Sequence, residues 1–246
     1  MSSNGRPIIQ VQNVFKNYPV GDSEVEVLKG VSFDVPAGQF LAIVGSSGNG
    51  KSTLLNMIAG IDHPTSGKVI VADQALDAMN ENQLAAWRGP NLGIVFQFFQ
   101  LLPSLSLLQN VIMPMDFTGM LTKKQRRERA YRLLHLVGLS DQVDKLPSMI
   151  SGGQQQRAAI ARALANDPPI VVADEPTGNL DTQTSEELFA LFDRLSLRGK
   201  TLVMVTHSQA LARRASRMIE VKNGLIERDL YREVSSAPQV REAAPA

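Results

Sequence analysis

The sequence predicts an α/β fold in which a core of buried strands is interrupted by a helical insertion. Three short apolar runs, at residues 40–44, 169–173 and 201–205, have the length and continuity of buried strands. Between about residue 80 and residue 167, apolar residues instead recur at helical spacing. Together these patterns predict a strand core with helices inserted into it.

The remaining segments also carry strand, turn or helix signals. Residues 8–16 and 23–34 alternate apolar and polar residues, as strands do, and Pro36-Ala37-Gly38 ends the second strand. Asn223-Gly224 predicts a two-residue hairpin turn between strands 217–221 and 225–228. The remaining expected elements are a strand at 67–74, helices at 51–60, 83–88, 109–119, 123–137, 152–166, 182–197 and 209–214, and a disordered tail at 235–246.

Composition excludes several kinds of protein. The chain has 25 basic and 24 acidic residues, so its net charge of +1 indicates no bulk attraction to nucleic acid or anionic lipid. It has no cysteine, which excludes disulfides, a thiol nucleophile and cysteine-ligated zinc. The N-terminus lacks the apolar run of a signal peptide, and no stretch approaches the ~20 apolar residues of a membrane-spanning helix. We therefore expect a soluble protein that reaches a membrane only through a partner.

A glycine-rich loop that suits phosphate binding joins the strand at 40–44 to the helix at 51–60. It fits G-x-x-x-x-G-K-[ST], with glycines that let successive backbone N–H groups point at phosphates next to a helix N-terminus. Lys51 would reach the β- and γ-phosphates, and Ser52 would bind Mg²⁺. A plain strand-to-helix turn is the alternative, but it gives no reason for a lysine followed by two hydroxyl residues. The loop residues are Gly45, Ser46, Ser47, Gly48, Asn49, Gly50, Lys51, Ser52 and Thr53.

Polar residues follow the next two apolar runs. Asp174 is predicted to bind the magnesium ion, and Glu175 to act as general base on the attacking water. The alternative is that these polar residues merely end a strand. The intact phosphate loop makes this alternative less favoured. His207 lies at the end of the next strand, where α/β folds place ligands, and could hydrogen-bond a γ-phosphate. His63 and His135 are interpreted as structural or exposed.

One motif identifies a family. Ile150-Ser151-Gly152-Gly153-Gln154-Gln155-Gln156-Arg157 resembles the signature motif of ATP-binding cassette (ABC) proteins, with Ile150 where leucine is usual. Further matches follow in the family's order. Tyr18 resembles the residue that stacks on adenine, Gln97 the glutamine that contacts magnesium and senses the γ-phosphate, and His207 the switch histidine. Gly178-Asn179-Leu180-Asp181 resembles the loop that connects the two ATP sites. Asn49 departs from the usual serine, but is expected to contribute mainly backbone.

The resemblance implies a P-loop NTPase fold of the ABC nucleotide-binding type. It consists of a mixed sheet core, an antiparallel β subdomain and a helical subdomain insertion. The expected domain is 8–234, with the insertion at about 92–167. The family implies ATP and Mg²⁺ as cofactors and a homodimer around two ATP. Each ATP would lie between one copy's phosphate loop and the other copy's signature residues, Ser151, Gly152, Gly153 and Gln154, at a helix N-terminus suited to anions.

Further residues resemble the lipoprotein-releasing and macrolide-exporting branch of the family. They are Tyr18-Pro19-Val20-Gly21, the turn at 60–67, the segment 96–103, and the segment 173–181. The branch implies an ATPase that drives an integral-membrane permease from the inner face of the bacterial cytoplasmic membrane. A regulatory, non-transporting role in cell division through a permease-like partner remains the alternative. A nucleic-acid-processing ABC ATPase is less favoured, because the chain has one phosphate loop, no long coiled-coil insertion and a low net charge.

A group of large apolar residues follows Gln97. Phe98, Phe99, Leu101 and Leu102 are the candidate surface for docking the permease, because exposed apolar patches commonly mark partner sites. The alternative is that these side chains belong to the core, which is the default for large apolar residues.

Overall fold

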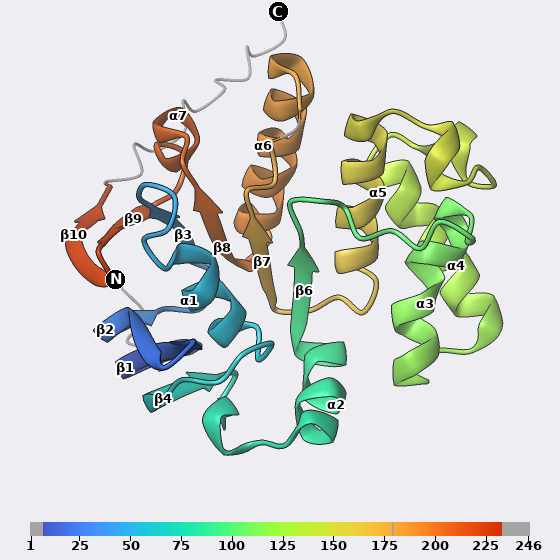
Figure 1. The fold of residues 1–246 in the computed structure, drawn as a ribbon. Coiled ribbons are helices and arrows are strands. Elements are labelled where there is room, and N and C mark those ends of the chain that lie inside the picture. Colours follow the sequence, from blue (N-terminus) through green and yellow to red (C-terminus); the bar gives the residue numbers. More distant parts are fainter. Residues whose placement is uncertain (1–6, 179, 233–246) are drawn as a thin grey trace, which may run out of the picture.

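The computed structural model describes residues 7–178 and 180–232, in which two β-sheets enclose a helix and further helices cover the larger sheet (Figure 1). The larger sheet has the order β10-β9-β3-β8-β7-β6. Its strands β3, β9, β8, β7 and β6 run parallel to their neighbours, and β10 pairs antiparallel with β9. The bounds are β3 (Phe40–Val44), β6 (Leu92–Val95), β7 (Ile170–Asp174), β8 (Thr201–Thr206), β9 (Arg217–Lys222) and β10 (Leu225–Tyr231).

The three apolar runs of the sequence are the centre of this sheet. Every residue of β3 and β8 is buried, and β7 is buried up to Asp174. Helices cover both faces of these strands, which is why their sequences do not alternate. The hairpin turn at Asn223-Gly224 is confirmed, and both residues have positive φ, of 51° and 80°, as a type I′ turn requires.

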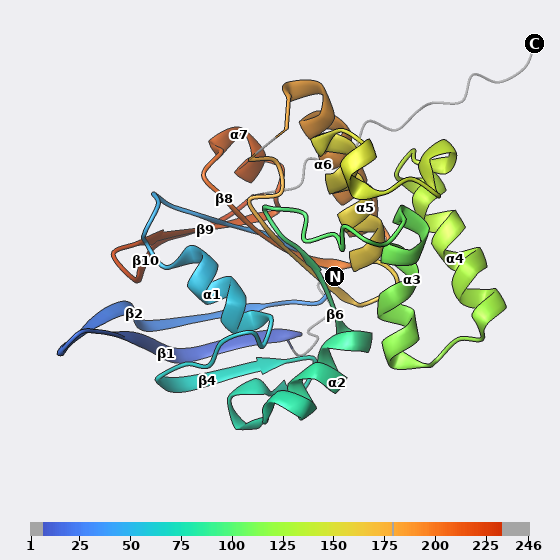
Figure 2. The same cartoon turned by 45° about the vertical axis from the view of Figure 1, so that its right-hand side comes forward.

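The smaller sheet is antiparallel, with the order β2-β1-β4-β5. Its strands are β1 (Ile9–Val20), β2 (Ser23–Val35), β4 (Ser66–Val71) and β5 (Gln74–Ala75). Helix α1 (Lys51–Ile58) lies between this sheet and the larger one (Figure 2). One hydrophobic cluster joins the three, with Leu54 and Ile58 of α1 fully buried in it.

Three helices pack together on one side of the larger sheet: α3 (Leu107–Thr118), α4 (Lys123–Leu136) and α5 (Gly152–Ala163) (Figure 1). Each begins at a Ser or Thr whose side chain caps the first turn, as the sequence of these N-termini favours. The remaining helices are α2 (Glu81–Asn91), α6 (Thr182–Leu197), α7 (Gln209–Ala212) and the 3₁₀ turns η1 (Leu76–Ala78), η2 (Ser140–Gln142) and η3 (Pro147–Met149).

Strand β6 was not expected, because the helical insertion was predicted to begin at about residue 92. Leu92–Val95 pairs with β7 and so belongs to the larger sheet. Four residues that include Gly93 are too few to show a strand pattern. A Cβ at Gly93 would lie 2.4 Å from the carbonyl oxygen of Ala163, so the glycine permits the close approach of α5.

The expected strand at 67–74 is two strands, β4 and β5, and the 3₁₀ turns were not predicted, whereas the other differences lie at the ends of elements. Helices expected to reach residues 60, 166 and 214 end at 58, 163 and 212. The tail at 235–246 lies outside the described residues. Within the described ranges, no helix combines the length and apolar character needed to cross a bilayer.

Candidate functional site

The phosphate loop connects the end of β3 to the start of α1, and its glycines are required by its shape. Gly45, Gly48 and Gly50 have φ of 148°, 80° and 91°, in the region that favours glycine. A Cβ at Gly45 would lie 2.2 Å from the carbonyl oxygen of Val221, and one at Gly50 would lie 2.8 Å from Cδ2 of Leu28. The loop therefore combines a special backbone with close contacts to neighbouring strands.

The N-terminus of α1 has no side-chain cap. Gly50 is its N-cap, whereas α2 to α6 are capped by Asn80, Ser106, Thr122, Ser151 and Asp181. The first amides of a helix need external acceptors, so this end of α1 is suited to bind an anion.

A cavity of about 370 Å³ opens at this helix end. Lys51 is 7% exposed, and its Nζ donates to the carbonyl oxygen of Ser46 at 3.0 Å, which places an ammonium group beside the loop. The lining residues are Val27, Ser47, Gly48, Gly50, Lys51, Ser52, Thr53, Gln97, Glu175 and His207. Backbone N–H groups, a lysine and hydroxyl side chains fit a polyphosphate.

Asp174 reaches the phosphate loop from the end of β7. The hydroxyl of Ser52 donates to its Oδ1 at 3.1 Å. Burial raises the pKa of Asp174 above its ordinary value, and the neighbouring Glu175 adds to this, while the Ser52 hydrogen bond and Lys51 oppose it. A positive charge beside this carboxylate would offset the desolvation.

The donors fit a magnesium ion. Mg²⁺ prefers oxygen ligands and usually takes one or two carboxylates together with substrate phosphates and water. Ser52 and Asp174 supply such oxygens at the edge of the cavity. One hydroxyl and one carboxylate suit an ion whose other ligands are phosphate oxygens and water.

Glu175 and His207 form a pair at the other side of the cavity. Oε2 of Glu175 lies 2.9 Å from Nδ1 of His207 and also accepts from the backbone N–H of His207 at 3.4 Å. Glu175 has a φ of 43°, which is unusual for a residue with a side chain, and its N–H donates to the carbonyl oxygen of Val205 at 2.9 Å. The strained backbone turns the chain sharply after β7 and fixes the carboxylate in the cavity.

Gln97 follows β6 and is part of the same cavity lining. A Cβ at Gly178 would lie 3.4 Å from Nε2 of Gln97, so the amide side chain packs against the turn that follows Glu175. The structure thus brings together Lys51, Ser52, Gln97, Asp174, Glu175 and His207. His63 and His135 are not part of the cavity lining, and Asn179 lies outside the described residues.

Tyr18 is in β1, outside the cavity lining but linked to α1. Its hydroxyl donates to Oδ2 of Asp62 at 2.5 Å and interacts with Thr53 of α1. Lys16 donates to Oδ1 of Asp62 at 2.6 Å, and its Nζ lies 4.7 Å from the centre of the Tyr18 ring. These contacts fix the ring position near the helix that carries the phosphate loop.

The Ser151–Gln154 turn is not part of this cavity lining. At the start of α5, the Ser151 hydroxyl accepts from the N–H of Gln154 at 3.3 Å, and Oε1 of Gln154 accepts from the N–H of Ser151 at 2.9 Å. A Cβ at Gly153 would lie 2.8 Å from Cγ2 of Thr184, so α5 closely approaches α6 here. Within one copy, the Ser151–Gln154 turn and Lys51 therefore do not line the same cavity.

The four apolar residues after Gln97 do not share one environment. Phe98 is 68% exposed and Leu102 is 41% exposed, whereas Leu101 packs against the core cluster. Phe99 lies close to α5, since a Cβ at Gly152 would be 3.6 Å from its ring. The core interpretation therefore holds for Leu101, whereas the docking surface stays a prediction, to which Phe98 and Leu102 contribute the exposed side chains.

Three residues around the site make side-chain contacts that were not predicted from the sequence. Nε2 of Gln156 donates to the carbonyl oxygen of Pro176 at 2.8 Å, which ties α5 to the turn after Glu175. Arg162 donates to the carbonyl oxygens of Phe99 and Gln100, the segment that follows Gln97. Asn49 contributes more than backbone: its Oδ1 accepts from the N–H of Asn223 at 3.3 Å. Only the run of glutamines in 154–156 gave a signal in the sequence.

Comparison with known proteins decides the family. A protein-family model described as "ABC transporter" matches residues 28–178, which is more than half of the chain. The chain belongs to the ABC transporter ATP-binding family.

Relatives and solved structures agree with this assignment. The ABC chain is 46% identical over 222 residues to an uncharacterized ABC transporter ATP-binding protein of Thermotoga maritima, covering 90% of this chain and 94% of that protein. It is 44% identical over 223 residues to the macrolide export ATP-binding/permease protein MacB of Escherichia coli K12, covering 91% of this chain. Because it matches only 34% of MacB, the chain spans about a third of that relative.

A solved structure matches the whole ABC fold. It is the dimeric post-hydrolysis state of the cassette MJ0796 bound to ADP and phosphate, with a TM-score of 0.86 and 40% identity, covering 91% of this chain and 98% of that one. The predicted fold class is confirmed: an ABC cassette with a mixed sheet, an antiparallel sheet and a group of helices. The chain is an ATP-binding and ATP-hydrolysing ABC subunit.

Proposed function

We propose that two copies of this chain bind two ATP between them and use hydrolysis to drive a membrane permease. The observation that carries the proposal is the division of the anion-binding elements. Lys51, Glu175 and His207 share one cavity, while the Ser151–Gln154 turn at the start of α5 lies outside it. A second copy facing the cavity could supply that turn. The dimeric arrangement of MJ0796 supports this geometry.

Each residue of the cavity would have a separate task. Lys51 and the open N-terminus of α1 would bind the β- and γ-phosphates. Ser52 and Asp174 would hold Mg²⁺ with Gln97 nearby, and the ion, when bound, would neutralise phosphate charge. Tyr18 would stack on the adenine, with its ring held by Lys16 and Asp62.

Glu175 would take a proton from the attacking water as the water forms a bond to the γ-phosphorus and the bond to the β-phosphate oxygen breaks, giving ADP and phosphate. His207 would orient Glu175 through the 2.9 Å contact and could donate to a γ-phosphate oxygen.

Mixed dimers test the division of the site. Ser151→Ala in one copy and Glu175→Gln in the other should leave one of the two composite sites with both wild-type halves. Placing both substitutions in the same copy should instead damage both composite sites. We expect the first mixed dimer to hydrolyse ATP faster than the second. Equal rates for the two arrangements would contradict a site shared between copies.

The resemblance to MacB supports a permease of the macrolide-export type, and with it a peripheral position on the inner face of the cytoplasmic membrane. A lipoprotein-releasing permease is the other type that the sequence features of this branch suggest. A cavity of about 600 Å³ lies between α2, β6, α3 and α5 and is lined in part by Phe96, Gln100 and Phe117. Together with the exposed Phe98, it could receive a helix of such a permease.

Substitution of Phe98 tests the docking surface. Because Phe98 is 68% exposed, Phe98→Asp should disturb the fold little while placing a charge on an apolar contact. We expect the permease to be lost from the purified complex, with ATP binding retained. Leu101→Asp is not a suitable variant, since Leu101 packs against the core. Undiminished co-purification with Phe98→Asp would show that docking occurs elsewhere.

A further inference from the structure

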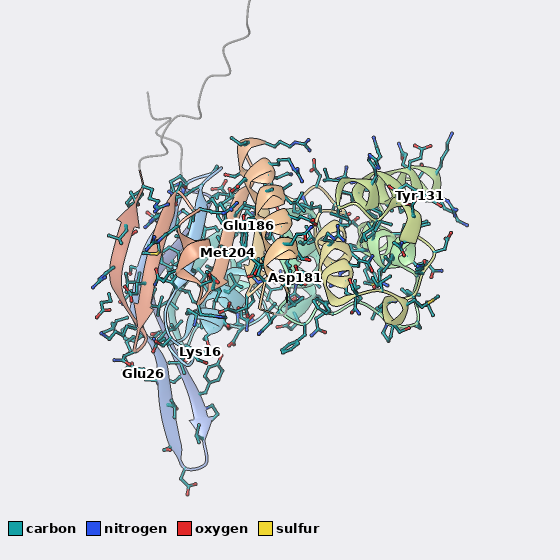
Figure 3. The ribbon with its side chains drawn as sticks, turned by 90° about the horizontal axis from the view of Figure 1, so that it is seen from above. Lys16, Glu26, Tyr131, Asp181, Glu186 and Met204 are labelled. Carbon is teal, nitrogen blue, oxygen red and sulfur yellow. The ribbon has the colours of Figure 1, made fainter. Side chains whose placement is uncertain are left out.

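The low net charge of the chain conceals one strongly basic helix. Six of the ten residues from Lys123 to Arg132 are lysine or arginine and one is glutamate, although the whole chain has a net charge of only +1. This segment is the first part of α4, the outermost of the three packed helices (Figure 2). Figure 3 labels Tyr131 on α4, toward the right-hand end of the molecule, and this side chain packs partly against the core cluster.

The positive charges lie at the wrong end of the helix for stability. A helix N-terminus favours negative side chains, yet the first turn of α4 has no acidic residue and begins with Lys123 and Lys124. Three of the basic side chains near this end, Lys123, Lys124 and Arg127, are exposed. The helix dipole therefore does not favour these charges, which suits an external anionic partner.

Acidic residues of the chain neutralise little of the positive charge of α4. Asp116 pairs with Arg126, and Glu128 lies 3.9 Å from Lys124 with both side chains exposed. Arg129 is turned inward, to the carbonyl oxygens of Leu164 and Ala165 and to Asp167. Arg127 instead lies along the outer face, with its guanidinium 5.4 Å from the centre of the Tyr131 ring.

Apolar side chains stand at the same corner. Phe117, in the last turn of α3, is 82% exposed, and Met120, between α3 and α4, is 58% exposed. Arg126 fixes this corner by binding Asp116 and the carbonyl oxygen of Leu121. Exposed apolar residues beside lysines and arginines are typical of surfaces that bind anionic bilayers, because the apolar groups enter the interface while the cations bind headgroups.

We infer that the α3–α4 corner, defined by Phe117, Met120, Lys123, Lys124 and Arg127, binds the anionic lipid surface of a membrane. Nucleic acid would also attract the charges, but it offers no apolar layer for Phe117 and Met120. The corner continues from the cavity assigned to the permease, because Phe117 also lines that cavity. Lipid contact would thus hold the subunit against the membrane beside its partner.

Vesicle binding of the full chain alone tests the inference. Wild type should float with phosphatidylcholine vesicles that contain phosphatidylglycerol, should not float with pure phosphatidylcholine vesicles, and should dissociate as salt is raised. Lys123→Gln, Lys124→Gln and Arg127→Gln together should weaken binding roughly 100-fold, since each basic residue near such a surface contributes about a fivefold factor. Met120→Gln should also weaken binding.

Matched controls separate this effect from folding and from overall charge. Lys29, Lys68 and Arg198 are exposed in other parts of the fold, and their combined change to Gln removes the same charge but should leave vesicle binding intact. Neutralising the start of α4 should maintain or raise Tm, because the removed charges oppose the helix dipole.

Several results would overturn the inference: equal binding of wild type to both vesicle types, unchanged binding of the α4 triple variant, equal losses in both triple variants, or binding of duplex RNA without vesicle binding. The assay contains neither permease nor ATP, so its failure would leave the proposed function intact.

Discussion

Oε2 of Glu175 lies 2.9 Å from Nδ1 of His207, although 31 residues separate them in the chain. Strands β7 and β8 are parallel neighbours, and their carboxyl ends place the two side chains together. The kinked backbone of Glu175, with φ at 43°, holds the carboxylate toward the cavity. The contact couples Glu175, the proposed general base, to the residue that directly follows β8.

Glu175→Gln should lower ATP hydrolysis about 100-fold or more, because a general base contributes ~10²–10⁴ to the rate. The amide keeps the shape of the side chain but cannot take a proton from water. Nucleotide affinity should be retained, so ATP should accumulate in a stable dimer visible by size-exclusion chromatography. Phosphate release at the wild-type rate would exclude Glu175 as the base.

His207→Ala should reduce hydrolysis about tenfold or more if the contact between His207 and Glu175 orients the carboxylate, as proposed. If His207 acts through the carboxylate, then adding His207→Ala to Glu175→Gln should cause little further loss, because residues that act as a unit are not additive. Single-turnover rates of the two single variants and the double variant measure this. Fully multiplicative losses would show that the two residues act independently.

Lys51→Ala should weaken nucleotide binding itself, in contrast to Glu175→Gln. Loss of a charge-assisted hydrogen bond to phosphate is expected to raise the Kd for ATP about 10- to 100-fold. Equilibrium binding of a fluorescent ATP analogue measures the change. Thermal unfolding without nucleotide serves as the control, since Lys51 has a hydrogen bond to the loop at Ser46 that the variant also loses.

Asp62→Asn should make stability less dependent on pH. Burial acts to raise the pKa of Asp62, but hydrogen bonds from Lys16, Tyr18 and the N–H of His63 outweigh it and hold the pKa below its ordinary value. A carboxyl group whose folded pKa is lowered stabilises the protein above about pH 4, and this stability is lost as pH falls through the folded pKa. Tm of the wild type should therefore fall more steeply below pH 5 than Tm of Asp62→Asn. Asp22→Asn, at an exposed turn, is the control.

Arg162→Met should slow hydrolysis about tenfold while changing nucleotide affinity little. Arg162 holds the carbonyl oxygens of Phe99 and Gln100, which have positive φ of 43° and 54°, in the segment directly after Gln97. Without the guanidinium, this segment should relax and Gln97 should lose its fixed position. Rates measured well below Tm distinguish this effect from a loss of stability. Unchanged hydrolysis at that temperature would limit Arg162 to a structural role.

The sequence by itself determined the local features of this protein. The continuous apolar runs gave the buried strands β3, β7 and β8, and G-x-x-x-x-G-K-[ST] gave the phosphate loop, because each depends on neighbouring residues. Helix α6 was predicted with its observed bounds, since its apolar spacing runs unbroken from Thr182 to Leu197. The resemblance to ABC proteins added the roles expected for Gln97, Ser151 and Tyr18.

Only the tertiary structure decided which residues meet. Strand β6 forms through pairing with β7, and its four residues carry too little pattern to show this in advance. The contacts of Asp62 with Tyr18 and of Arg162 with Gln100 join segments 44 and 62 residues apart, and no local pattern encodes them. The exposure of Phe98 beside the packed Leu101 depends on how the chain turns after β6. Burial and long-range contact are properties of the packed chain, so sequence patterns can suggest them but only packing determines them.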